Sequence, residues 1–214
     1  MTRLKPSVRW TLAAAAVAIA LIAALVFQLR DDSAPGAGTQ GRSDREHRPA
    51  DTTAALSGLR QRANLPPCPV GDGDRTTPAA VLSGVLVECA ADGQPVDVGR
   101  ALAGRRVVLN LWAYWCTPCM AELPAMAEYQ RRMGPSVLVV TVHQDENEAA
   151  ALARLSELGV RLPTLQDGRR LVGAALHIPK VMPATVVLRP DGSVAETLSR
   201  DFATADEIAA AVGL

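Results

Sequence analysis

Two cysteines, Cys116 and Cys119, enclose a Thr-Pro dipeptide directly after an apolar run, in the segment LWAYWCTPCMAELP. Cysteines at this spacing can act as a redox couple, bind a metal ion or form a structural disulfide. A redox couple and a metal site both use the thiolate form of cysteine, whereas a structural disulfide needs no reactive sulfur. The residues around the pair decide between these three uses.

The surrounding residues fit a metal or haem site poorly. Zinc would need two further ligands, and the remaining cysteines, Cys68 and Cys89, have 20 residues between them instead of forming a second close pair. A c-type haem requires histidine directly after the second cysteine, and that position holds Met120. A disulfide that closes so small a loop stabilises a fold only slightly. Redox chemistry is therefore favoured, and we expect neither a metal nor another cofactor.

The pair also lies where a buried strand, predicted over residues 105–115, becomes a helix, predicted over residues 117–133. The first sulfur would then lie beside unpaired N–H groups at the positive end of the helix dipole, which lowers a thiol pKa from about 8.5 towards roughly 4 to 7. We therefore expect Cys116 to be the attacking thiolate and Cys119, one turn inside the helix, to be shielded.

The elements that must position this pair alternate between strands and helices from about residue 80. Asp92-Gly93 predicts a hairpin between two extended runs, and Pro190-Asp191-Gly192 predicts another within residues 184–198. The apolar spacing predicts further strands at 136–142 and 161–167, and helices at 100–104, 146–160, 169–178 and 204–214. This order predicts an α/β fold with helices on both faces of one sheet.

The N-terminal part has a different composition. Thr11–Leu29 is 19 residues without a charge, and such a helix would span about 28 Å, which is enough to cross a bilayer. Three basic residues precede it, and two acidic residues follow Arg30, so the N-terminus is expected to be cytoplasmic. An uncleaved anchor is favoured over a signal peptide, because no small-x-small cleavage site follows directly. Both alternatives make the rest of the chain extracytoplasmic.

Four regions are expected from these patterns. Residues 30–53 are rich in Gly, Pro, Ser and charge, which is typical of a flexible tether. The regions are a cytoplasmic N-terminus (1–10), a transmembrane anchor (11–29), a tether with a short helix (30–63) and a folded domain (64–214). Within the folded domain, residues 64–104 form an extension with the first hairpin and residues 105–214 form the core.

With 22 basic and 22 acidic residues the chain has no net charge, which argues against a nucleic-acid partner.

Two motifs carry a resemblance to a known family. VVLNLWAYWCTPCMAELP, followed some 60 residues later by VMPATVVLRPDGSV, resembles thioredoxin-fold proteins, and specifically their membrane-anchored TlpA and ResA group. The resemblance covers residues 80–214 and implies a thioredoxin-like fold with a central mixed sheet. It also implies that Pro183 is cis and lies against the active disulfide, that Met182 presents its backbone to a substrate peptide, and that Trp115, Thr117 and Pro118 belong to the substrate-binding surface.

Two neighbouring positions indicate the branch of this family. Many thioredoxins carry a buried aspartate six residues before the first cysteine, and this chain has Asn110 there. Glu122 matches a glutamate of the TlpA and ResA group, and a carboxylate held in apolar surroundings can serve as a proton acceptor near neutral pH. Its alternative role is that of a solvated helix carboxylate. Pro124 matches a proline that kinks the helix in that group, and alone it would indicate a helix break.

Cys68 and Cys89 are expected to form a structural disulfide, since an even leftover pair in an oxidising compartment is most simply bonded. The alternative is a second exchanging pair that relays electrons to Cys116 and Cys119. Neither Cys68 nor Cys89 precedes a helix start that would activate it. His143 and His177 are expected to be structural or surface residues.

The expected function is that of an extracytoplasmic thiol-disulfide oxidoreductase acting on protein thiols or disulfides. The resemblance favours a reductase, with apocytochrome c as a substrate and a membrane protein as the electron donor. A disulfide-forming oxidase is the alternative on the same fold, because direction depends on a reduction potential that no motif encodes. A metal-binding chaperone or a redox-inert interaction module is the alternative outside enzymes.

Overall fold

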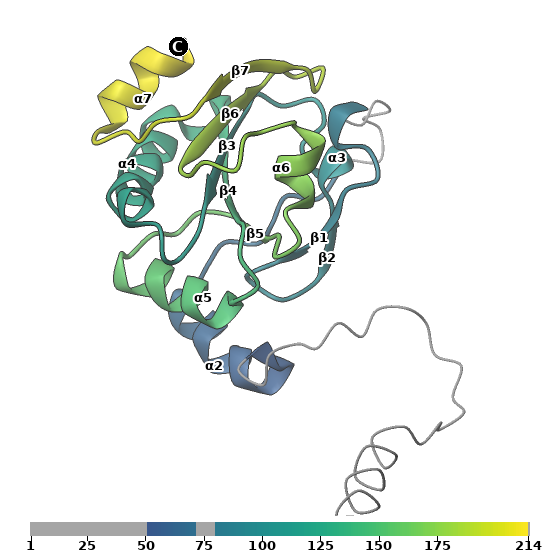
Figure 1. The fold of residues 1–214 in the computed structure, drawn as a ribbon, viewed down its shortest axis with the longest axis vertical. Coiled ribbons are helices and arrows are strands. Elements are labelled where there is room, and N and C mark those ends of the chain that lie inside the picture. The colour runs from purple at the N-terminus through teal and green to yellow at the C-terminus, as the bar shows by residue number, and fades with distance from the viewer. Residues whose placement is uncertain (1–50, 72–79, 214) are drawn as a thin grey trace, which may run out of the picture. The chain divides into compact units, whose positions relative to one another are not determined.

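One mixed sheet of seven strands organises the computed structural model, which describes residues 51–71 and 80–213 (Figure 1). The strands follow the order β2-β1-β5-β4-β3-β6-β7 across the sheet. Strands β3, β4 and β5 are parallel, and every other pairing is antiparallel. The strands are β1 (Leu86–Cys89), β2 (Pro95–Asp97), β3 (Val107–Trp112), β4 (Leu138–His143), β5 (Thr164–Gln166), β6 (Ala184–Leu188) and β7 (Val194–Leu198).

Helices cover both faces of this sheet, which confirms the expected α/β architecture (Figure 1). One face carries α2, α4, α5 and α7, and the other carries α3 and α6. The helices are α2 (Thr53–Ala63), α3 (Val98–Ala101), α4 (Thr117–Met133), α5 (Glu148–Glu157), α6 (Leu171–Ala175) and α7 (Ala205–Val212), with short 3-10 turns η2 (Ala80–Leu82) and η3 (Gly134–Ser136).

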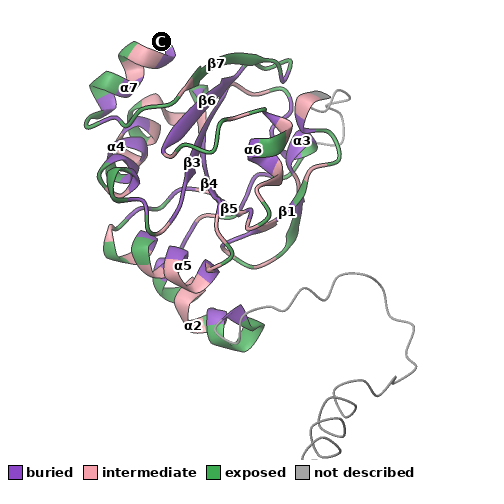
Figure 2. Cartoon of the chain, in the orientation of Figure 1, coloured by how far each residue is buried: buried purple, intermediate pink, exposed green. Residues whose placement is uncertain are grey.

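Strand β3 lies near the middle of the sheet and leads directly to the cysteine pair. All six of its residues are buried, as expected for a central strand covered on both faces (Figure 2). Because side chains alternate along a strand, Val108 and Trp112 pack with α4, whereas Leu109 and Leu111 pack on the opposite face. Asn110 shares the face of Val108 and therefore points towards α4.

The hairpins and the long helices agree with the expectations from the sequence. Gly93 (φ 77°) and Gly192 (φ 81°) adopt the left-handed conformation in the two hairpin turns. Helix α4 covers residues 117–133, as predicted, and Gly134 ends it with φ 57°. Helix α3 begins at Val98 instead of residue 100, because the Asp97 side chain accepts a hydrogen bond from Arg100 N and caps the helix earlier.

Helix α2 belongs to the folded domain, although the short helix expected within residues 30–63 was grouped with the tether. Leu56 and Ala63 are buried in the same apolar cluster as α4 and α5. Arg60 forms an ion pair of 2.9 Å with Glu148 on α5, and both side chains are largely buried. The domain therefore extends N-terminally beyond the expected boundary at residue 64, because tertiary packing holds a helix of weak apolar periodicity.

The expected anchor (11–29) and most of the expected tether (30–50) lie outside the described residues. Within residues 51–71 and 80–213, no helix combines the length and the apolar content that crossing a membrane requires.

Candidate active site

The Cys116–Cys119 disulfide lies at the start of helix α4. Cys116 is the N-cap residue, and its Sγ accepts a hydrogen bond from the backbone N–H of Cys119 at 3.3 Å. Cys119 is fully buried, and Cys116 is 4% exposed. A thiolate at this position would be stabilised by the same N–H group and by the helix dipole.

The residues next to Cys116 form the exposed rim of this site. Trp115 is 53% exposed, and Thr117 and Pro118 are exposed as well. Cys116 is therefore the sulfur nearer to this rim, and Cys119 lies behind it. This asymmetry fits the expected division between an attacking and a shielded sulfur.

The peptide bond between Met182 and Pro183 is cis, as the resemblance implied. Pro183 directly precedes β6, whose first residue, Ala184, pairs with Leu111 of β3. This register puts Pro183 at the end of the sheet where β3 leads into the cysteine pair. Met182 is half-buried, and its neighbour Val181 is 52% exposed, so apolar surface borders the site on this segment as well.

Glu122 lies on α4 one turn after Cys119, and it is fully buried. Its Oε2 accepts a hydrogen bond of 2.8 Å from the Asn110 side-chain amide, which projects from β3. Burial raises the pKa of Glu122 to about 7; the Asn110 hydrogen bond opposes this increase, and the negative charge of Asp201 adds to it. The alternative of a solvated helix carboxylate is excluded by this burial.

The backbone before the cysteine pair is held by His143, the last residue of β4. The buried imidazole accepts a hydrogen bond at Nε2 from the backbone N–H of Tyr114 (3.4 Å), and its Nδ1 lies 2.8 Å from Oε1 of Gln166. The Trp112 ring packs against it with centroids 4.9 Å apart. Burial lowers the His143 pKa, so the neutral ring that donates from Nδ1 and accepts at Nε2 is the form that fits these partners.

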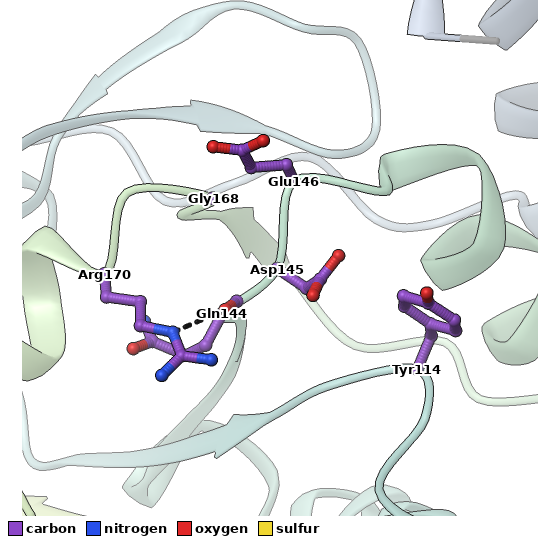
Figure 3. A pocket seen from close by; sticks show the side chains of 6 residues that line it. All are labelled: Tyr114, Gln144, Asp145, Glu146, Gly168 and Arg170. Carbon is purple, nitrogen blue, oxygen red and sulfur yellow. Dashed lines mark hydrogen bonds between the residues drawn. The ribbon is translucent and has the colours of Figure 1, made fainter. Parts of the chain in front are cut away.

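A cleft of about 420 Å³ adjoins this backbone (Figure 3). Asp145 and Tyr114 face one another in it, and Arg170 lies across the cleft, where its Nε donates to the carbonyl oxygen of Gln144 at 3.0 Å. Asp145 also accepts a hydrogen bond of 3.0 Å from Nε1 of Trp115. The cleft therefore connects to the exposed rim of the disulfide through Trp115; its lining residues are Tyr114, Gln144, Asp145, Glu146, Gly168 and Arg170.

The second disulfide joins Cys68 to Cys89, with Cα atoms 5.8 Å apart. Cys89 is the last residue of β1, and both cysteines belong to the apolar cluster on the sheet face opposite α4. Cys68 is 9% exposed and Cys89 is 2% exposed. No helix begins at either residue, so neither sulfur has the N–H environment of Cys116.

Comparison with known proteins agrees with this geometry. A family model described as Redoxin matches residues 72–212. The chain is 32% identical over 99 residues to "Thiol-disulfide oxidoreductase ResA" of Bacillus subtilis (strain 168). The aligned region covers 46% of this chain and 55% of that protein. The chain thus spans about half the length of the curated relatives it matches.

Solved structures give the same fold. The structure of MTB DsbF in mixed oxidised and reduced forms matches with a TM-score of 0.56 and 26% identity, over 64% of this chain and 97% of that one. A DsbF homologue from Corynebacterium diphtheriae matches with a TM-score of 0.55 and 25% identity, over 61% of this chain and 83% of that one. The expected thioredoxin-like fold and the resemblance to ResA are therefore confirmed.

Several contacts at the site are not predicted by the sequence patterns. The sequence marks Asn110 only as the position of a missing aspartate, and the structure shows that it is the hydrogen-bond partner of Glu122. The sequence predicts a structural or a surface role for His143; the residue is fully buried and contacts the Tyr114 backbone, so the structural alternative holds. No motif indicates Asp145; the one sequence signal for it is its position just after a predicted strand, at the same edge of the sheet as Cys116.

Proposed function

Because the chain belongs to the Redoxin family, we propose that it is a thiol-disulfide oxidoreductase whose exchanging pair is Cys116 and Cys119. The observation that carries the proposal is the position of Cys116 Sγ, which caps helix α4 and accepts the N–H of Cys119. This N–H and the helix dipole favour a thiolate at Cys116, the form that attacks disulfides.

In the reductive direction, the Cys116 thiolate attacks one sulfur of a substrate disulfide, and the other substrate sulfur leaves as a thiolate. A mixed disulfide between Cys116 and the substrate results. Cys119 then loses its proton, for which Glu122 is the acceptor, and attacks Cys116 Sγ, so that the second substrate sulfur leaves. The substrate gains two electrons, and the chain ends with the Cys116–Cys119 disulfide.

The residues that border Cys116, some exposed and some partly or wholly buried, are the proposed substrate surface. Trp115, Thr117 and Pro118 border the sulfur on the α4 side, and Met182 and Pro183 border it on the β6 side. An extended peptide lying along Met182 would bring its own sulfur to Cys116. This surface is apolar and aromatic, which suits a protein substrate better than a small polar thiol.

We infer a reductase anchored in the membrane by Thr11–Leu29, with the catalytic domain extracytoplasmic. The uncharged length and its basic N-terminal flank support the anchor, and a second pair of cysteines in the domain suits an oxidising compartment. Resemblance to the TlpA and ResA group supports apocytochrome c as a substrate. Each turnover oxidises the pair, so an electron donor is required to restore the dithiol, and we propose a membrane protein for this role.

The deciding measurement is the reduction potential of the pair in the purified full chain, equilibrated with glutathione or dithiothreitol buffers. A midpoint well below about −200 mV supports the reductase, and a midpoint near −120 mV supports the disulfide-forming oxidase. A metal-binding chaperone would instead bind zinc stoichiometrically at Cys116 and Cys119 and catalyse no exchange. That result would refute the enzyme proposal.

A further inference from the structure

Asn110 and Glu122 form a buried polar contact between the central strand and helix α4. Both residues are fully buried. The Asn110 amide nitrogen donates to Glu122 Oε2 at 2.8 Å and lies 3.5 Å from the hydroxyl oxygen of Thr185 on β6. The amide nitrogen is therefore oriented by two different elements.

One oxygen of each side chain is left without a partner. Asn110 Oδ1 and Glu122 Oε1 are both buried, and neither has a hydrogen-bond partner among the described residues. Two buried acceptors without a donor are costly, since each has lost its hydrogen bonds to water. A single proton on Glu122 Oε1 would supply the one donor that both oxygens lack.

We propose that Asn110 and Glu122 form a carboxylic acid–amide pair in which the Asn110 N–H is donated to Glu122 Oε2 and the Glu122 Oε1–H is donated to Asn110 Oδ1. Both hydrogen bonds then join the same two planar groups, and every polar atom of the pair is satisfied. Asn110 is thus a positioning residue that holds Glu122 as an acid while the cysteines are bonded.

This inference rests on the proposed thiol-disulfide exchange, in which Glu122 accepts the proton of Cys119. The pair would hold a proton next to the buried cysteine and keep it from solvent. Asp201, in the segment between β7 and α7, carries a negative charge that also favours the acid form of Glu122. The neighbouring side chains from the sheet, Asn110 on β3 and Thr185 on β6, are polar but carry no charge.

Infrared difference spectra of the oxidised full chain test the pair directly. The spectrum of the chain minus that of its Glu122→Gln variant isolates the Glu122 carboxyl group. From about pH 5 to pH 9 we expect a protonated-acid carbonyl band that disappears on titration. In Asn110→Ala the band is expected at the higher frequency of an acid without hydrogen bonds. An unchanged band in Asn110→Ala, or an ionised carboxylate at every pH, would overturn the proposal.

A double variant, Asn110→Asp with Glu122→Gln, serves as an atom-for-atom exchange of acid and amide. It keeps one acid and one amide at the same place, so we expect a protonated-acid band whose midpoint lies within about one pH unit of the parent's. Asn110→Asp alone places two acids in contact, and its last ionisation should move up by about one pH unit or more. The absence of any acid band in the double variant would contradict the pair.

Asn147→Ala is the control for losing a partly buried asparagine hydrogen bond elsewhere. Asn147 caps helix α5, where its Oδ1 accepts from Ala150 N at 3.1 Å. This variant is expected to lose stability without changing the Glu122 band.

Exchange with a model peptide disulfide is measured in parallel on the parent chain. If the parent chain fails to exchange while the Glu122 band behaves as expected, the proposed function fails and the acid–amide pair stands.

Discussion

The Cys116–Cys119 and Cys68–Cys89 disulfides lie on opposite faces of one sheet. Cys89 belongs to β1, and Cys116 follows β3, so three strand spacings, roughly 14 Å, separate their strands. Cys116 caps a long helix, has an exposed rim and has a buried carboxylate one turn beyond its partner. Cys68 and Cys89 are surrounded by aliphatic side chains such as Leu82 and Leu165.

The difference lies in the surroundings of the sulfurs. A reactive pair needs a stabilised thiolate, access for a second protein and a nearby proton acceptor, and these features surround Cys116. The separation of the two pairs by the sheet also argues against a direct relay of electrons between them. Cys68–Cys89 therefore has the environment of a structural cross-link, which joins the segment after α2 to the first hairpin.

Exchange activity should depend on one pair alone. Cys116→Ser removes the attacking sulfur, so turnover of a peptide disulfide is expected to fall to the level of the buffer control. Cys119→Ser keeps the first attack but removes the sulfur that resolves it, and a mixed disulfide should accumulate and be visible by mass spectrometry. A Cys68→Ser, Cys89→Ser variant that lost turnover while folded would contradict this separation of roles.

The free energy of unfolding should depend on the Cys68–Cys89 disulfide, which exchange activity does not require. Replacing both Cys68 and Cys89 with alanine is expected to lower the free energy of unfolding by about 3 kcal/mol, because the disulfide closes a loop across 21 positions. Urea unfolding measures the change, and the rate of exchange in the folded variant should be unaltered. A decrease of less than about 1 kcal/mol would show that the extension is held without the cross-link.

Local signals in the sequence were sufficient for much of this fold. The two Gly-containing turns, the cap at Cys116 and the 3.6-residue spacing of 117–133 act within a few residues of one another, so α4 and both hairpins could be predicted. Helix α2 could not be assigned to the domain, since its burial depends on Leu56 and Ala63 meeting α5, which lies far away in the chain.

The site was predictable to a similar extent. A short motif is enough to locate the cysteine pair at the start of a helix and to single out Glu122, whereas the order of attack stays a prediction. The contact from Asn110 to Glu122 was not predictable, because it depends on which face of α4 lies on β3. The His143 contact with Tyr114 likewise requires the parallel pairing of β4 with β3, which brings two strand ends together.

Glu122, which lies close to the reactive pair, should make the free energy of unfolding depend on pH. Burial raises its pKa from 4.5 to about 7, so the folded state binds the proton more tightly than the unfolded state. The contribution of protonated Glu122 to the free energy of unfolding is therefore fully present below about pH 4.5. It is lost as the pH rises through about 7, and the loss amounts to at most about 3 kcal/mol. Glu122→Gln should abolish this loss in urea unfolding from pH 4 to 8, and the same slope in both proteins would refute the assignment.

His143 should give a smaller dependence of the opposite sign. Burial lowers its pKa, so the folded state favours the neutral ring, and its contribution is present above the unfolded value of about 6.5 and is lost as the pH falls. His143→Leu should remove this acid-side loss while costing about 1 to 2 kcal/mol at neutral pH through the lost acceptor for Tyr114 N–H. An unchanged acid-side profile would show that another group causes it.

The smallest expected effect concerns the exposed rim. Asp145 accepts the Trp115 indole N–H at 3.0 Å, and this contact fixes an aromatic side chain that is half exposed beside Cys116. A hydrogen bond of this kind contributes about 0.5 to 1.5 kcal/mol, so Asp145→Ala should slow exchange by about 2- to 10-fold with little change in reduction potential. Asp145→Asn keeps an oxygen acceptor and should retain most of the rate. Equal rates in both variants and the parent would show that the orientation of Trp115 does not limit the encounter with substrate.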